Sequence, residues 1–373
     1  MKVCLDIQSA VGKRTGVGRY TIKLAESLIA NKGEDSIILF AFDFLGRGSH
    51  LPLFQGATKK LIRWCPGRVA RLCWKTFNYP SFNVFAGNAD VYHFPNFILP
   101  PLKKRKSIVT IHDLSFLRYP QFTERKNLTY LTSRIHDTVT RADLIITDSN
   151  YIGEELQEYL KVPPDRIVVI YPGISEEFKH LSPDEISAMS ERGHRKMDCP
   201  YLLTVGTIEP RKNLEFMIEL FENMPEFDGK LVIAGMLGWK YEPVLQRIAR
   251  STRREHIALL GYVDDKMLPA LYSGAQLFLC CSYYEGFGFP PLEAMACGTP
   301  VVSSTGGSLS EVLENGAVLI DKFDIEQWKH EINQLLNDLE WRTKVIARGY
   351  QCVTRYSWTQ TAVHMWQTYR RFK

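Results

Sequence analysis

The segment from Ser282 to Gly307 contains two acids with seven residues between them, Glu285 and Glu293. Glycines and a Pro-Pro pair separate the acids, so one continuous helix cannot carry both. The pattern predicts that Glu285 lies on an open loop and that Glu293 lies in the first turn of a helix that begins at the prolines. Loop N–H groups and the positive end of the helix dipole would favour an anion there, most naturally phosphate.

Two adjacent cations, Arg211 and Lys212, follow a predicted strand and a turn that begins at Gly206. Cations are disfavoured at the start of a helix, so a diphosphate bound between them and the helix dipole would explain their position. Arginine binds phosphate through two hydrogen bonds, and lysine acts as a point charge. A basic turn exposed to solvent is the alternative explanation.

Other candidate residues stand at the ends of predicted strands. Gly16 and Gly18 follow the first strand, where glycine would let the backbone approach a diphosphate. A complete dinucleotide-binding pattern needs a third glycine where the chain has Thr21, although Asp43 stands where a ribose-binding acid would lie. His112 ends a later strand and would face the ligand crevice. A structural histidine is the alternative.

The composition is that of a soluble globular protein, with 45% hydrophobic and 23% charged residues, and a length of 373 residues suggests two domains. Apolar runs are too short to cross a membrane, and the first residues lack the pattern of a cleaved signal peptide. The eight cysteines show no metal-ligand spacing, which favours free thiols in a reducing compartment. We therefore expect a cytoplasmic protein.

Positive charge is concentrated in residues 1–180. The run from Arg63 to Lys75 mixes cations with Trp64, Leu72 and Trp74, a pattern that suits peripheral contact with an anionic membrane at the inner face. A solvated basic face is the alternative. No nucleic-acid-binding module is recognisable, so nucleic acid is not an expected partner.

β-rich runs alternate with helical patterns along the chain, which predicts parallel sheets with helices on both faces. The first set of strands is expected at residues 2–7, 36–42, 90–93, 107–111, 144–147 and 167–171. The second set is expected at 201–205, 230–234, 257–260, 276–280, 300–303 and 317–320. Helices are expected at 19–31, 124–141, 149–160 and 358–371.

The stretch E-G-F-G-F-P-P-L-E-A-M-A-C-G-T-P-V-V-S-S around the two acids resembles the E-x7-E signature of retaining glycosyltransferases of family 4. T-G-V-G-R-Y resembles the first loop of that family, T-I-H-D its histidine position, and G-T-I-E-P-R-K-N its phosphate-binding turn. One departure is Thr207, where some members carry a further arginine. The resemblance covers most of the chain and is weakest at residues 51–88.

This resemblance implies the α/β fold called GT-B, in which two Rossmann-like, doubly wound parallel-sheet domains face each other across a cleft. The expected parts are an acceptor-binding domain at residues 1–180, a linker at 181–198 and a nucleotide-sugar-binding domain at 199–355. Residues 356–373 would form a C-terminal helix that crosses back to the first domain.

The resemblance also implies residue roles. The expected catalytic residues are His112, Glu285, Arg211 and Lys212. The expected donor-binding residues are Gly16, Gly18, Gly206, Tyr262, Val263, Phe287, Gly288, Phe289 and Glu293. Glu285 would hold the transferred sugar and Glu293 the ribose, while Asp113 would orient His112 or contribute to acceptor binding. No metal and no cofactor beyond the nucleotide-sugar donor is expected.

The segment T-I-H-D-L-S-F-L-R-Y-P looks like mannosyltransferases of O-antigen and related polysaccharide assembly. The expected reaction is therefore retaining transfer of a hexose, mannose from GDP-mannose, to a lipid-linked or polysaccharide acceptor. Alternatives are a UDP-sugar-dependent enzyme of the same family, a GT-B nucleotide-sugar epimerase and a non-catalytic nucleotide-sugar-binding protein. An epimerase would act without an acceptor, and a binding protein would be expected to lack one of the cations or acids.

Overall fold

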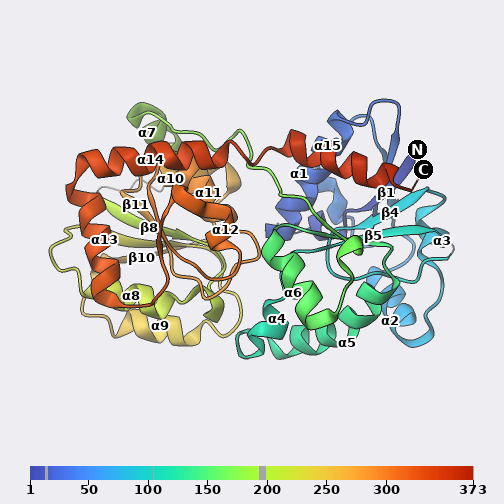
Figure 1. Ribbon diagram of the computed structural model, residues 1–373, viewed down its shortest axis with the longest axis horizontal. Coiled ribbons are helices and arrows are strands. Elements are labelled where there is room, and N and C mark those ends of the chain that lie inside the picture. The colour runs from blue at the N-terminus through green and yellow to red at the C-terminus, as the bar shows by residue number, and fades with distance from the viewer. Residues whose placement is uncertain (13–15, 104, 193–198, 373) are drawn as a thin grey trace. The chain divides into compact units, whose positions relative to one another are not determined.

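A computed structural model describes residues 1–12, 16–103, 105–192 and 199–372 of the protein (Figure 1). The chain forms two compact units. Unit 1 comprises Met1–Leu117, Asn127–Gly173 and Tyr356–Lys373, and unit 2 comprises Arg118–Lys126 and Ile174–Arg355. Residues 13–15 of the expected glycine loop and residues 193–198 of the expected linker lie outside the described residues.

Unit 1 contains a parallel seven-stranded sheet in the order β3-β2-β1-β4-β5-β6-β7. Its strands are β1 (Lys2–Asp6), β2 (Ser36–Phe42), β3 (Thr58–Ile62), β4 (Val91–Phe94), β5 (Lys106–Ile111), β6 (Leu144–Thr147) and β7 (Ile167–Val169). Six of these match predicted strands within one or two residues. The seventh, β3, was not predicted, because an edge strand with two lysines and exposed first residues lacks a continuous apolar run.

Helices lie on both faces of this sheet, as expected for right-handed crossovers between parallel strands (Figure 1). The helices of unit 1 are α1 (Gly16–Ala30), α2 (Gly67–Phe77), α3 (Phe82–Ala86), α5 (Arg125–Arg141), α6 (Asn150–Leu160) and α15 (Trp358–Arg370), and the short α4 (Ser115–Arg118) ends at the boundary with unit 2. Ser149 caps the N-terminus of α6, where its hydroxyl accepts a hydrogen bond from the Ile152 N–H group.

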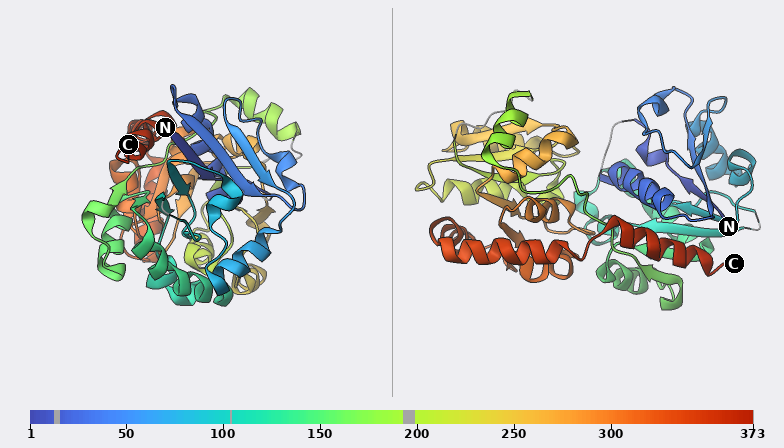
Figure 2. Two further views of the ribbon diagram at one scale, coloured as in Figure 1. Left: turned by 90° about the vertical axis from the view of Figure 1, so that its right-hand side faces the viewer. Right: turned by 90° about the horizontal axis from the view of Figure 1, so that it is seen from above.

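The C-terminal helix α15 packs against α1 in unit 1, as the family resemblance implies (Figures 1 and 2). Trp366 is buried and donates its indole N–H to the Leu28 carbonyl at 3.1 Å. Gly173 allows the chain to approach the start of this helix, because a Cβ atom there would lie 2.1 Å from the Trp358 nitrogen. The last element of the sequence is therefore part of the first unit.

Unit 2 contains a parallel six-stranded sheet in the order β10-β9-β8-β11-β12-β13. Its strands are β8 (Tyr201–Val205), β9 (Lys230–Ala234), β10 (Ile257–Gly261), β11 (Leu277–Cys280), β12 (Val301–Ser304) and β13 (Val318–Ile320). Its helices are α7 (Pro183–Arg192), α8 (Leu214–Glu222), α9 (Glu242–Ala249), α10 (Leu268–Ser273), α11 (Phe289–Ala296), α12 (Leu309–Leu313), α13 (Ile325–Asn337) and α14 (Leu339–Val353). All six strands match predicted strands within one residue.

The segment expected to be a linker, residues 181–198, differs from that expectation. Unit 2 already begins at Ile174, and helix α7 occupies Pro183–Arg192 and packs against α10. The polar composition that indicated a linker belongs instead to a surface helix, which begins at a capping pair between Ser182 and Glu185.

Candidate functional site

The main candidate site lies in unit 2, where the strand order reverses. Strands β8 and β11 are neighbours, but the chain leaves them toward opposite edges of the sheet. Loops at the carboxyl ends of two such strands diverge and leave a crevice, which is where ligands bind in open α/β sheets. The loops after β8 and β11 carry Arg211, Lys212 and Glu285, so this edge of the sheet brings three predicted catalytic residues together.

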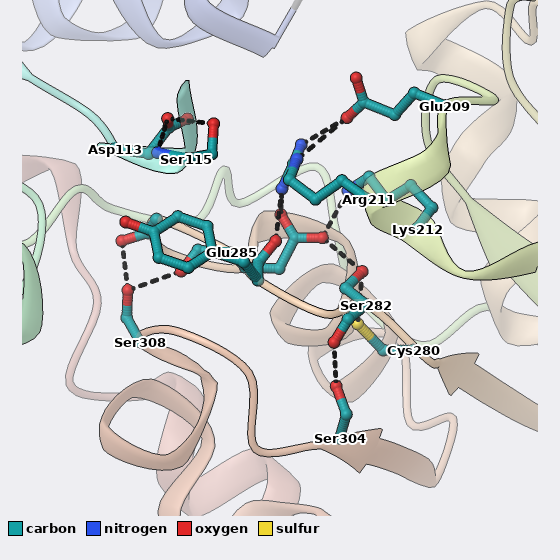
Figure 3. A network of polar contacts seen from close by, with 12 residues as sticks. Asp113, Ser115, Glu209, Arg211, Lys212, Cys280, Ser282, Glu285, Ser304 and Ser308 are labelled. Atoms are coloured by element: carbon teal, nitrogen blue, oxygen red, sulfur yellow. Dashed lines mark hydrogen bonds and ion pairs between the residues drawn. The ribbon is translucent and has the colours of Figure 1, made fainter. Parts of the chain in front are cut away.

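Glu285 is the centre of this network (Figure 3). Its carboxylate accepts hydrogen bonds from Arg211 Nη1 at 2.7 Å and from Lys212 Nζ at 2.5 Å. The Ser282 hydroxyl donates to the same carboxylate at 2.6 Å. Both carboxylate oxygens therefore have donors, and the side chain is buried.

The two cations keep Glu285 ionised. Burial alone would raise the pKa of Glu285, but the positive charges of Arg211 and Lys212 outweigh burial and lower this pKa to about 2. The carboxylate is therefore negative at neutral pH and compensates both cations. Sequence spacing had suggested a phosphate-binding role for the cations but not that Glu285 is their partner in the protein itself.

Arg211 also connects this network to Glu209. The guanidinium donates from Nε and Nη2 to Glu209 Oε1, at 3.1 and 2.6 Å, and from Nη1 to the Tyr284 carbonyl at 2.6 Å. Glu209 is buried, and within the described residues its Oε2 accepts no hydrogen bond. The Arg211 guanidinium is thus held by hydrogen bonds to Glu209, the Tyr284 carbonyl and Glu285. Lys212 donates one of its three N–H groups to Glu285.

The Glu285 loop is held in place by the segment after β12. The Ser308 hydroxyl donates to the Glu285 carbonyl at 3.0 Å, and the Glu285 N–H donates to the Gly306 carbonyl at 3.2 Å. Gly307 has φ +68°, and a Cβ atom at this position would lie 2.3 Å from the Glu285 carbonyl oxygen. Only glycine fits such a close approach in the left-handed region.

The turn after β8 depends on glycine as well. Gly206 has φ +151°, and a Cβ atom there would lie 3.3 Å from Lys212 Cε. Across the turn, a Cβ atom at Gly235 would lie 1.8 Å from the Gly206 carbonyl oxygen. These two glycines let the ends of β8 and β9 approach each other and leave room for the Lys212 side chain.

Helix α11 begins at Phe289, with prolines at its second and third positions, and Gly288 before it has φ +106°. The predicted loop and helix are thus observed, with one correction. Glu293 is the fifth residue of α11, so it begins the second turn rather than lying in the first. It is buried and accepts a hydrogen bond from the Tyr272 hydroxyl of α10 at 2.9 Å.

The remaining predicted donor residues of unit 2 lie around these loops. Phe287 is buried and its ring contacts that of Phe289 with 5.0 Å between centroids. Tyr262 and Val263 follow β10, and the Tyr262 side chain is about half exposed while Val263 is buried. None of these contacts tests a role in donor binding, which stays a prediction.

Gly16 and Gly18, in unit 1, do not lie on a loop. Both belong to the first turn of α1, which begins at Gly16, so the predicted loop ends earlier than expected. Thr15, the first residue of the T-G-V-G-R-Y motif, lies outside the described residues. Gly16 is exposed, and no heavy atom lies within 4 Å of a Cβ atom built there.

His112 follows β5 and is hydrogen bonded at both ring nitrogens. Nδ1 lies 2.6 Å from Asp148 Oδ2, and Nε2 lies 2.9 Å from the Pro95 carbonyl oxygen. A carboxylate and a carbonyl can only accept, so both contacts are satisfied when the imidazole carries both protons. Burial lowers the pKa of His112, but Asp148 and the Pro95 carbonyl raise it more, so the pKa lies above its usual value.

The residue that orients His112 is therefore Asp148, not Asp113. Asp113 accepts hydrogen bonds from the Ser115 N–H and hydroxyl groups at 3.0 and 2.7 Å, so it instead stabilises the start of α4 (Figure 3). Asp148 stands at the carboxyl end of β6, next to β5 in the sheet. Its position after a predicted strand was the signal in the sequence that could have identified it.

No group of three or more His, Cys, Asp or Glu side chains in the described ranges is arranged to hold a metal ion. In the same part of the chain, no helix is both long and apolar enough to span a membrane. The predicted independence from metals stays a prediction.

Two protein-family models match the chain. The model described as Glycosyltransferase Family 4 matches residues 14–178, and the model described as Glycosyl transferases group 1 matches residues 186–352. Together the two models span most of the sequence. The boundary between them lies between β7, the last strand of unit 1, and β8, the first strand of unit 2.

The chain is similar over nearly its full length to two O-antigen chain mannosyltransferases. The chain is 29% identical over 389 residues to the O-antigen chain mannosyltransferase B of Escherichia coli, covering 99% of this chain and 100% of that protein. It is 26% identical over 358 residues to the O-antigen chain mannosyltransferase RfbU of Salmonella typhimurium, covering 93% and 94% of the two chains. The solved sucrose-phosphate synthase of Thermosynechococcus elongatus has the same fold, with a TM-score of 0.78 at 19% identity and coverage of 100% and 98%.

Proposed function

Because this chain belongs to the family 4 glycosyltransferases and has the GT-B fold, we propose that it transfers mannose from GDP-mannose to a growing glycan of the O-antigen type, with retention at the anomeric carbon. The observation that carries the proposal is the Arg211–Lys212–Glu285 network at the carboxyl ends of β8 and β11. Full-length similarity to two O-antigen mannosyltransferases supports the choice of sugar and acceptor class.

In this proposal the diphosphate of the donor binds beside Lys212 and Arg211, near the N-terminus of α11. As the bond from C1 to the β-phosphate oxygen breaks, its electron pair remains on that oxygen, and the cations stabilise the developing charge. The acceptor hydroxyl attacks C1 from the same face and passes its proton to the leaving phosphate. Lys212 has N–H groups beyond the one given to Glu285, so it can bind phosphate without losing that contact.

The acids have separate roles in this proposal. Glu285 is negative and adjacent to both cations, so it positions them and accepts hydrogen bonds from sugar hydroxyls. Glu293 would repel a phosphate, so a ribose diol is its proposed partner. His112 is assigned to the transferred sugar, where a ring kept cationic by Asp148 would act through its positive charge and not as a base, since both ring N–H groups are hydrogen bonded within the protein.

A panel of nucleotide sugars tests the donor. GDP-mannose is expected to stabilise the protein against thermal unfolding more than UDP-glucose, UDP-N-acetylglucosamine or ADP-glucose, and the product of transfer should have the anomeric configuration of the donor. Lys212→Ala should lower kcat by a factor of about 100 or more while the fold is kept. A preference for a UDP-sugar would replace the mannosyl assignment, and an absence of binding to all nucleotide sugars would contradict a transferase.

Peripheral contact with an anionic membrane is proposed for the surface around α2. Large apolar side chains are exposed on and around this helix, next to its cations. The exposed apolar residues are Trp64, Val69, Leu72, Phe77 and Tyr79. Such a mixture binds anionic lipid through apolar insertion and charge.

Cosedimentation with vesicles tests this surface. The protein should bind phosphatidylglycerol vesicles at low salt and dissociate at high salt, and Leu72→Glu should weaken binding. Leu339→Glu is the matched control, because Leu339 is also largely exposed, at 75% against 63% for Leu72, but lies in unit 2. Equal binding of the two variants would contradict a specific role for α2.

A further inference from the structure

The C-terminal helix α15 reaches the interior of unit 1 through Tyr369. The Tyr369 hydroxyl oxygen lies 2.8 Å from His93 Nδ1, and His93 Nε2 lies 2.8 Å from the Thr110 hydroxyl oxygen. His93 belongs to β4 and Thr110 to β5, and all three side chains are fully buried. Three polar side chains from three elements thus form one continuous set of hydrogen bonds in the core, which we call the polar row.

Packing alone does not account for the polar row. A buried polar group costs free energy unless it is hydrogen bonded, and apolar side chains of the same shape would fill the space without that requirement. Burial and the positive charge of His112 lower the pKa of His93 to about 3, so the His93 ring is neutral. A neutral imidazole has one donor and one acceptor nitrogen, and the hydroxyl groups on its two sides can match either tautomer.

The polar row ends beside His112. Thr110 and His112 are two positions apart at the end of β5, a spacing that places both side chains on one face of the sheet. The effect of His112 on the pKa of His93 agrees with this placement, because it shows that the charge of one ring acts on the other. The row therefore connects α15 to the strand end that carries His112.

A second set of contacts joins α15 to the same histidine. Tyr20 of α1 is buried, and its ring meets the His112 ring edge to face with 4.7 Å between centroids. The Tyr20 ring also lies 5.7 Å from that of Trp358, the first residue of α15, whose carbonyl accepts a hydrogen bond from the Ser27 hydroxyl at 2.5 Å. Burial and the negative charge of Asp148 raise the pKa of Tyr20, so its hydroxyl stays neutral.

We propose that α15 is a positioning element for His112, acting through the polar row on one side and through Tyr20 on the other. Tyr20, His93 and Tyr369 are positioning residues in this proposal, because they act through His112 rather than on a substrate. The inference rests on the proposed function where it concerns transfer, since His112 is assigned there to the transferred sugar. It also gives the tyrosine of the T-G-V-G-R-Y motif a role apart from donor binding.

The charge of His112 depends on groups from several elements. Asp148 after β6 and Asp113, the next residue in the chain, both raise the pKa of His112, while His93 of β4 and Tyr20 of α1 are neutral. The Tyr20 ring covers the imidazole, and its loss would let water reach the His112–Asp148 pair. Water weakens the attraction between the two charges, so the raised pKa of His112 should then fall toward its ordinary value.

NMR titration of His112 in the full chain tests the ring contact without any substrate. In Tyr20→Leu the pKa of His112 should fall by about 0.5 unit or more. Tyr20→Phe is the conservative control, because it keeps the ring, and the pKa of His112 in this variant should match that of the wild type. An unchanged pKa of His112 in folded Tyr20→Leu would overturn the role of Tyr20.

Tyr369→Phe tests the polar row, because it keeps the ring and removes the hydroxyl. For transfer from GDP-mannose, kcat should fall about tenfold with an unchanged KM for the donor, since His112 is then placed less strictly. Thr368→Val is the matched control: Thr368 is buried on the same helix, and its hydroxyl donates to the His364 carbonyl within that helix. A lower free energy of unfolding with unchanged kcat in Tyr369→Phe would show a merely structural role and overturn the proposal.

Thr110→Val interrupts the same row at its other end. In a double-mutant cycle, Thr110→Val and Tyr369→Phe together should lower kcat by less than the product of their separate effects, because either substitution alone breaks the row. Independent effects that multiply would contradict a continuous row.

The positioning role and the proposed reaction fail in different ways. If no nucleotide sugar is turned over, the transferase reaction is wrong, but NMR still reports on positioning: the His112 ring resonances should shift in Tyr369→Phe and not in Thr368→Val. If GDP-mannose is used normally while Tyr369→Phe and Tyr20→Leu match the wild type in kcat and in the pKa of His112, the reaction stands and the role of α15 is wrong.

Discussion

Glu285 illustrates how one residue can serve both structure and chemistry. It accepts hydrogen bonds from a lysine, an arginine and a serine while it is buried. Removing one member of a buried ion pair leaves an uncompensated charge, which costs about 3–5 kcal/mol. We therefore expect Glu285 to stabilise the loops of the site as well as the transferred sugar.

The first prediction concerns acid stability. The pKa of Glu285 is lowered from 4.5 to about 2 in the folded protein, so its stabilising contribution is present above pH 4.5 and is lost as the pH falls toward 2. A shift of this size corresponds to about 3 kcal/mol. In Glu285→Gln the free energy of unfolding should be lower at pH 7 and should fall less steeply below pH 4.5, as measured by urea denaturation. The same acid slope in both proteins would contradict the ion-pair assignment.

The second prediction concerns Asp148 as a positioning residue. In Asp148→Asn the pKa of His112 should fall, because the carboxylate that favours the imidazolium is lost. The raised pKa of His112 stabilises the folded wild type below the unfolded value, and this contribution disappears as the pH rises through the folded value. NMR titration of the His112 ring protons measures the shift. An unchanged pKa of His112 would mean that Asp148 does not stabilise the positive charge of the imidazole.

At the scale of elements, the Glu285 loop depends on the segment after β12 rather than on its own sequence. Ser304 donates to the Ser282 carbonyl at 2.5 Å, and Ser308 donates to the Glu285 carbonyl. Gly307, one of two glycines between these serines, forms a parallel β-bridge with Glu285 and so brings the two segments into backbone contact. The S-S-T-G-G-S sequence is thus a support for the site and not a flexible linker.

The third prediction compares two glycines with similar φ values. Gly307→Ala should lower the free energy of unfolding by about 2 kcal/mol or more, because it adds a steric clash with the Glu285 carbonyl to the cost of a left-handed residue. Gly33→Ala is the control, because Gly33 has φ +57° and no atom within 4 Å of a Cβ built there. Thermal or urea unfolding of both variants gives the difference. Equal losses would show that the close approach carries no extra cost.

At the scale of the whole molecule, the chain begins and ends in the same unit. Asp35, which precedes β2, forms an ion pair with Arg370 of α15 at 2.9 Å. Buried aromatic side chains of α15 complete the face of unit 1 that α1 covers. Without α15, the face of unit 1 that α1 and α15 cover would lose these buried aromatic side chains.

The fourth prediction follows from this arrangement. Trp366→Ala should destabilise the protein by about 3–5 kcal/mol, because it removes a large buried side chain. Hydrogen exchange should show loss of protection in β1, β4 and α1 while β8–β13 keep theirs. Val363→Ala on the same helix is the control, since Val363 is 42% exposed. Loss of protection in unit 2 alone would contradict the assignment of α15 to unit 1.

The sequence by itself predicted strands β1, β2 and β4–β13 and helices α1, α5, α6, α11 and α15, and the chemistry assigned to the loops stays a prediction. Apolar runs bounded by polar residues placed the strands that are buried in the sheets, and the Pro-Pro pair placed the start of α11. The position of a buried strand and the start of a helix depend mainly on residues that are close in the sequence, so the sequence alone can predict them. The edge strand β3 and the helix in the expected linker were missed, because their burial is one-sided and their composition is polar.

Only the tertiary structure decided which charges meet. Glu285 pairs with cations 73 and 74 residues before it, and Asp148 pairs with a histidine 36 residues before it. These contacts follow from strand order, since β8 lies beside β11 and β5 beside β6, and that order is fixed by packing between distant segments. For this reason the sequence could predict a functional role for Glu285, but not that Glu285 is the partner that keeps Arg211 and Lys212 in place.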